Sequence, residues 1–140
     1  ANILIDGLKE YNHLLIPQKI EKHTDYIPYI LKFIWSGNHV IKKELLLKKL
    51  NSKGIPFTGG YGRMMHENPI FSKKIAYKKG FPYSFLKNKS LLKRYGTGSL
   101  PISEGINKNF LWFKFIHPPN NKKQMNFIIS TFKKILHNSL

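Results

Sequence analysis

The residues best suited to chemistry lie in a glycine-rich stretch near the middle of the chain, between Phe57 and Phe71. Within a few positions it carries a phenol, a guanidinium, an imidazole and a carboxamide, on Tyr61, Arg63, His66 and Asn68. Polar groups that leave a strand end and enter a long loop often line a ligand site. The stretch therefore predicts contacts to a polar ligand, with Ile70 and Phe71 anchoring the loop. The alternative is that Gly59-Gly60 makes a simple turn and the polar side chains only face water.

Other catalytic patterns are absent from the sequence. The six histidines lack the paired spacing of a metal site, so we expect no metal. The seven carboxylates do not pair as acid and base partners, and there is no Gly-Lys-Ser/Thr phosphate loop and no Gly-x-Ser-x-Gly turn. The lack of cysteine excludes disulfides, thiol nucleophiles and cysteine-bound metals. We therefore nominate no catalytic residue.

Three segments rich in β-forming residues are expected to be strands, and they must position this stretch. They are Tyr29–Trp35, Ile55–Thr58 and Phe110–Ile116. In the first, alternate residues from Tyr29 to Trp35 should share one face. Between the second and third strands, residues 61–98 show no clear period and should form a long loop, with a helical turn or two at Ser72–Tyr77.

Three helices are expected around these strands. Residues 2–11 carry apolar side chains at helical spacing but no capping residue before them, so residues 1–14 are interpreted as the end of a longer helix. A second helix should run from an N-cap at Asn38 to Lys53 and stop at Gly54. The third should follow Asn121, with Gln124 in capping-box position and an apolar face that includes Phe132.

These elements predict the fold class. Residues 1–140 should form one domain of the α/β type, an α+β two-layer sandwich in which helices cover one face of a small, three-stranded, mainly antiparallel sheet. No run of about 18 uncharged apolar residues and no signal peptide is visible, so we expect a cytoplasmic protein without a membrane partner.

The net charge of +17 raises the possibility of a nucleic-acid partner. Almost all of this charge is lysine, with Arg63 and Arg94 the only guanidinium groups, whereas phosphate and base recognition favours arginine. The lysines are also spread along the chain beside abundant Ile and Asn, a composition typical of codon bias in an AT-rich genome. We therefore interpret the charge mainly as a solvated surface.

Several runs together resemble the C-terminal small domain of the DegT/StrS-type sugar aminotransferases, closest to the branch that acts on ketosugars and cyclitols. The resemblance covers most of the chain from Leu15 onward, and its individual motifs are weak. Its runs are Lys53-Gly54-Ile55, Gly59-Gly60-Tyr61 to Asn68-Pro69-Ile70-Phe71, Leu100-Pro101-Ile102-Ser103-Glu104, Leu111-Trp112 and the helix from Met125 to Leu136. The sequence departs from the family where Gly62-Arg63-Met64-Met65 lacks the proline that commonly follows the tyrosine.

The resemblance implies a fold-type I enzyme that depends on pyridoxal phosphate and is usually a homodimer. Its small domain would close over a site built mainly by a large domain, which supplies the Schiff-base lysine. This chain would bind no cofactor alone; it would contact the sugar or cyclitol and the amino donor through Tyr61, Arg63, His66 and Asn68. Arg63 would suit a carboxylate or phosphate and His66 a hydroxyl, while Glu104 is interpreted as fixing local structure.

Two rival functions stay open at the level of sequence. One is a free-standing basic module that binds nucleic acid through its charge and exposed aromatic residues. The other is a scaffold domain that kept the fold without the chemistry. Of the three functions, the aminotransferase small domain is preferred, and the sequence leaves open which sugar or donor the parent enzyme uses.

Overall fold

The computed structural model describes residues 1–88, 90 and 95–140, so Arg94 and part of the expected long loop lie outside the described residues. The chain divides into two compact units. Unit 1 comprises residues 1–60 and 109–140, and unit 2 comprises residues 61–108.

Unit 1 is built on an antiparallel sheet of four strands in the order β1-β2-β4-β3. The strands are β1 (Leu15–Pro17), β2 (Leu31–Trp35), β3 (Thr58–Gly59) and β4 (Phe110–Phe113). The expected α+β class and antiparallel sheet are confirmed, but the sheet has four strands where the sequence predicted three. The missed strand, β1, is only three residues long and ends in a proline, which a strand tolerates at the edge of a sheet.

The core of unit 1 lies on one face of this sheet. Leu31, Phe33 and Trp35 are buried on that face, and Phe33 lies opposite Leu111 across the β2–β4 pair. Tyr29, which the alternation placed on the same face, is instead 82% exposed. The strand begins only at Leu31, so Tyr29 belongs to the preceding loop, where its carbonyl oxygen lies 2.8 Å from His117 Nε2.

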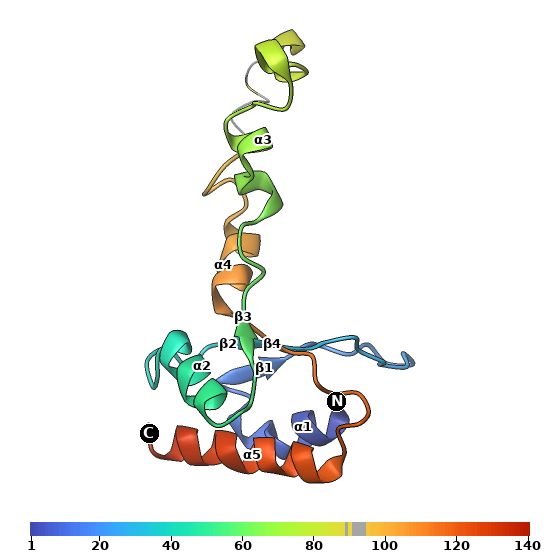
Figure 1. Ribbon diagram of the computed structural model, residues 1–140, viewed down its shortest axis with the longest axis vertical. Helices are drawn as coiled ribbons and strands as arrows, with labels where there is room; N and C mark the ends of the chain where they lie inside the picture. The colour runs from blue at the N-terminus through green and yellow to red at the C-terminus, as the bar shows by residue number, and fades with distance from the viewer. Residues whose placement is uncertain (89, 91–94) are drawn as a thin grey trace. The chain divides into compact units, whose positions relative to one another are not determined.

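Helices α1 (Asn2–Gly7), α2 (Lys43–Ser52) and α5 (Lys122–His137) pack with this sheet, and α5 runs along it beside α1 (Figure 1). Phe132 of α5 is fully buried and meets Phe57 edge-on, with ring centroids 5.1 Å apart. A Cβ at Gly7 would lie 2.3 Å from Ile129 Cδ1, so the glycine permits the close approach of α1 to α5. No described helix has the length and apolar character needed to cross a membrane.

Two of the three helix-end signals predicted in unit 1 are confirmed. Asn121 Oδ1 accepts from the Lys123 N–H at 2.9 Å, and Gln124 Oε1 accepts from the Asn121 N–H at 3.1 Å, which completes a capping box. Gly54 follows α2 with φ of +75°. Its N–H donates to the Asn51 carbonyl and the next N–H to the Leu50 carbonyl, the hydrogen-bond pattern of a Schellman ending.

The start of α2 differs from the prediction. Asn38 was expected to cap a helix beginning directly after it, but α2 begins at Lys43. Residues 37–41 form a separate turn in which the Ile41 N–H donates to the Gly37 carbonyl, and the Trp35 indole N–H donates to the Ile41 carbonyl at 3.1 Å. Asn38 still satisfies a helix donor, since its Oδ1 accepts from the Lys43 N–H at 3.0 Å.

Unit 2 consists of short helical pieces joined by turns. They are the 3₁₀ turns η2 (Met65–Glu67), η3 (Lys78–Gly80) and η4 (Tyr83–Phe85), and helix α3 (Pro69–Ser72); helix α4 (Pro101–Asn109) leads into β4. The helical turn expected at Ser72–Tyr77 therefore lies earlier, starting at Pro69, and α4 was not predicted as an element. Among the described residues of unit 2 only His66 is buried. Unit 2 is therefore held together by polar contacts and by ring contacts between partly exposed side chains, such as Phe71 and Tyr95 with centroids 5.7 Å apart.

Candidate functional site

All four residues selected from the sequence lie at the start of unit 2, in the segment that follows β3. Tyr61 is 65% exposed and Arg63 is also exposed, whereas His66 is buried and Asn68 is half-buried. The segment therefore presents a phenol and a guanidinium outward, and its imidazole points into the unit. Side chains of α4 hold the segment in this conformation.

The first of these α4 side chains is Asn107, whose amide oxygen and amide nitrogen both form hydrogen bonds with the backbone of the segment. Its Oδ1 accepts from the Tyr61 N–H at 2.9 Å, and its Nδ2 donates to the Gly62 carbonyl at 3.1 Å. Gly62 has φ of +75°, a backbone conformation that costs glycine little. The backbone that carries Tyr61 and Arg63 is thereby fixed to α4.

The second side chain is Glu104, one helical turn before Asn107 on α4. One of its oxygens lies 2.8 Å from His66 Nε2. Its carboxylate also accepts from the Gly98 N–H at 2.8 and 2.9 Å and from the Leu100 N–H at 3.2 Å. The Gly98 backbone bond is the main cause that lowers the pKa of Glu104; burial opposes it, and the bonds to His66 and Leu100 add to it.

Hydrogen bonds of Glu67 and Asn68 stabilise the C-terminal part of the segment. Glu67 Oε2 accepts from the Met64 N–H at 3.1 Å, and Glu67 Oε1 accepts from the Thr97 hydroxyl at 3.3 Å. Asn68 Oδ1 accepts from the Ile70 N–H at 3.1 Å and so caps α3. His66 and Asn68 are therefore engaged within unit 2, while Tyr61 and Arg63 present the exposed polar groups.

The fold and this geometry can be compared with proteins of known structure. The chain is similar to a DegT DnrJ EryC1 StrS aminotransferase from Brucella abortus. The similarity covers 96% of this chain and 30% of that chain, with a TM-score of 0.61 and 14% sequence identity. No family model matches the chain, and no curated protein matches it at the sequence level. At this identity the match shows a shared fold, and the chain spans less than a third of the length of the aminotransferase chain.

The similarity calls for a test of whether this chain could hold pyridoxal phosphate. That cofactor needs a lysine amine for its Schiff base and an acid beside its pyridine nitrogen. None of the described lysines is buried, and Glu67 and Glu104 are engaged in bonds within unit 2. No described lysine has the buried setting of a Schiff-base lysine, so the described residues do not fit that part of the cofactor and we assign no step through it to this chain. Within residues 1–88, 90 and 95–140 no group of three or more His, Asp or Glu could hold a metal ion.

The sequence selected Tyr61, Arg63, His66 and Asn68, of which only the first two are exposed, and it did not indicate most of the side chains that hold the segment in place. Glu104 was interpreted as fixing local structure, and its bonds agree with that interpretation. Asn107 was not considered. The signal available was its spacing: positions 104 and 107 share one face of a helix, so a predicted helix at Pro101–Asn109 would have placed both side chains together.

Proposed function

We propose that this chain is the C-terminal small domain of a pyridoxal-phosphate-dependent aminotransferase that acts on a ketosugar or cyclitol. The observation that carries the proposal is the shared fold with a DegT DnrJ EryC1 StrS aminotransferase over nearly the whole chain. The Schiff-base lysine would belong to a large domain elsewhere in the parent polypeptide. The chain would contribute substrate contacts and help to exclude water from the site.

Within this proposal two of the four loop residues contact the substrate and the other two support the loop. Tyr61 and Arg63 are exposed, so the phenol would donate to a sugar hydroxyl and the guanidinium would pair with a phosphate or carboxylate. His66, held by Glu104, and Asn68, which caps α3, would keep the loop in the shape that presents those two groups. The parent would work as a homodimer with an amino donor as second substrate.

The first experiment concerns the gene. The reading frame flanking these 140 codons should encode a large domain with a Schiff-base lysine. As a complementary measurement, the isolated chain is mixed with pyridoxal phosphate and reduced with borohydride. Mass spectrometry should then detect only scattered surface adducts. A stoichiometric adduct at one lysine would contradict the proposal that the lysine is supplied elsewhere.

The second experiment tests the substrate contacts in the parent enzyme. Arg63→Gln should raise the KM for the anionic substrate about tenfold, because the charge-assisted bond is lost, while cofactor absorbance stays unchanged. Lys78→Gln, which removes an exposed cation from the same unit, is the matched control and should leave KM unaltered. Equal effects of the two substitutions would point to a general charge effect and refute a contact at Arg63.

A further inference from the structure

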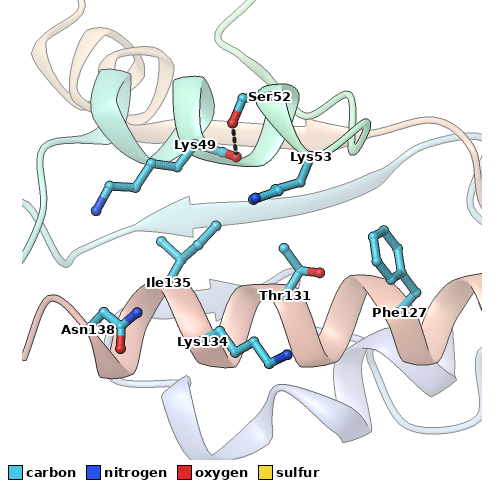
Figure 2. Close-up of a pocket in the computed structure, with 8 residues that line it drawn as sticks. All are labelled: Lys49, Ser52, Lys53, Phe127, Thr131, Lys134, Ile135 and Asn138. Carbon is cyan, nitrogen blue, oxygen red and sulfur yellow. Dashed lines mark hydrogen bonds between the residues drawn. The ribbon is translucent and has the colours of Figure 1, made fainter.

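A groove in unit 1 lies between the C-terminal part of α2 and the face of α5 that points toward it (Figure 2). Its volume is about 500 Å³, within the roughly 300–1,000 Å³ range of small-molecule sites. The residues that line it are Lys49, Ser52 and Lys53 from α2 and its C-terminal cap, and Phe127, Thr131, Lys134, Ile135 and Asn138 from α5 and its C-terminal cap.

Helical spacing explains why these side chains share one groove. Positions 127, 131, 134, 135 and 138 are linked by spacings of three and four residues (127 to 131, 131 to 134 and 135, then to 138), so they form one stripe along α5. Positions 49, 52 and 53 are linked in the same way on α2. The neighbouring stripe of α5 carries Ile128 and Phe132 into the core, which fixes the rotation of the helix. The groove is thus a consequence of the same packing that builds the sheet's covered face.

The groove concentrates positive charge that the protein itself does not neutralise. Among the described residues no carboxylate forms an ion pair with the groove lysines Lys49, Lys53 and Lys134, and α5 contains no acidic residue. Lys133, one position before Lys134, shows the contrast: its Nζ lies 2.6 Å from a Glu10 oxygen. The three groove lysines sit near helix C-termini, where the helix dipole tolerates a cation without a carboxylate. Their ammonium groups can therefore serve an external anion.

The groove also has an aromatic end. In Figure 2, Phe127 lies at one end and Lys49 and Asn138 at the other, with Lys53, Thr131 and Lys134 between them. The Phe127 side chain is 54% exposed, so part of its ring is open to a second planar group. Phenylalanine rings stack readily on nucleic-acid bases and other flat rings. The arrangement suits a ligand with a planar ring at one end and negative charge at the other.

We propose that this groove binds a free nucleoside phosphate. The base would stack on Phe127, and the phosphates would pair with Lys49, Lys53 and Lys134, with the Asn138 amide as a further donor. Lysine binds phosphate as a point charge and needs no fixed fork geometry, which fits three lysines on two separate helices. The site lies within unit 1 and does not depend on the proposed aminotransferase role of the loop in unit 2.

The test uses the full 140-residue chain and ATP as the probe, at low salt, by calorimetry and by amide NMR shifts. ATP should shift amides in α2 and α5 on the groove side, and Lys49→Gln or Lys53→Gln should each weaken its binding about two- to fivefold. Lys48→Gln is the matched control: it removes the same charge from the adjacent position of α2, outside the groove, and should leave the affinity unchanged. Phe127→Ala should weaken ATP binding but spare binding of inorganic tripolyphosphate.

Three outcomes would overturn the proposal. If Lys48→Gln weakens ATP binding as much as Lys49→Gln, the surface attracts anions without a site. Should tripolyphosphate bind as tightly as ATP, with Phe127→Ala silent, the aromatic contact does not exist. If a single-stranded oligonucleotide binds the groove more tightly than ATP, the occupant is nucleic acid. Circular dichroism of each variant verifies that an affinity change does not come from unfolding.

Discussion

Glu104 joins two stretches of unit 2, one near it in the sequence and one distant from it. Its carboxylate accepts hydrogen bonds from the backbone N–H groups of Gly98 and Leu100. It also lies within hydrogen-bond distance of the ring of His66, which is 38 positions earlier. A carboxylate bonded in this way favours its charged form, which is why the pKa of Glu104 is lowered. Protonation of this one side chain should therefore loosen the loop that carries Tyr61 and Arg63.

The acid response of this network is the first prediction. Because the pKa of Glu104 is lowered in the folded chain, its stabilising contribution is complete above the unfolded value of about 4.3 and is lost as pH falls through the folded pKa. The amide NMR shifts of Gly98 and Leu100 should titrate with a midpoint below that value, because both N–H groups donate to this carboxylate. In Glu104→Gln this acid titration should disappear. A midpoint at or above about 4.3 would contradict the prediction.

The chemistry-bearing residues were accessible to sequence reasoning, whereas their partners were not. Tyr61 and Arg63 follow a glycine pair at a strand end, which is a local signal. Glu104 and Asn107 reach this segment from 38 and 46 positions away, and nothing in a single sequence specifies such pairs. The burial of His66 is likewise a tertiary property, so its engagement with Glu104 could not be read from its neighbours.

At the scale of elements, the C-terminal end of α2 offers a test of backbone conformation alone. A Cβ at Gly54 would meet nothing within 4 Å, so φ of +75° is the main obstacle to another residue. Gly54→Ala should lower the free energy of unfolding by about 1–2 kcal/mol, the cost of a left-handed conformation. Gly54→Asn should cost less, because asparagine visits this region more readily. Equal stability of the wild-type and alanine chains in urea denaturation would contradict this account.

In helix α4 we expect a glycine-to-alanine substitution to raise stability, the opposite of its effect at Gly54. Gly105 lies inside this helix without a positive φ, and a Cβ there would have open space around it. Gly105→Ala should stabilise α4 by up to about 1 kcal/mol, because alanine loses less backbone entropy than glycine on folding. Hydrogen exchange of the α4 amides should slow accordingly, and the amides of α5 in unit 1 serve as the internal control. Faster exchange in α4 would show that Gly105 is required for another reason.

The helices that the sequence predicted well have recognisable capping residues at their ends. The Asn121–Gln124 box and Gly54 are examples, since each lies within a few positions of the groups it satisfies. The elements it missed lack such signals. β1 is too short to show alternation, and α4 contains a glycine, which lowers helix propensity, and buries no side chain.

At the scale of the whole molecule, charge opposes compactness. The chain carries 24 Lys and Arg against 7 Asp and Glu, so a net charge of +17 remains even where carboxylates form ion pairs such as Lys19–Glu21 and Lys133–Glu10. Raising NaCl from about 10 mM to about 300 mM should therefore raise the thermal midpoint, because screening weakens repulsion among the lysines. A midpoint that falls or stays constant would contradict this prediction. A much larger rise in phosphate than in NaCl at equal ionic strength would indicate bound anions in addition to screening.

The two places where the chain passes between its units lie side by side in the sheet. Gly59 pairs with Leu111, and the Gly60 N–H donates to the Phe110 carbonyl at 2.9 Å. In topological terms β3 and β4 are the arms of a hairpin, and the whole of unit 2 occupies the position of its turn. Lengthening a hairpin connection costs only about 0.6 kcal/mol per doubling. We therefore expect that unit 2 can be shortened, enlarged or replaced by a two-residue turn while the register of β3 against β4 is retained.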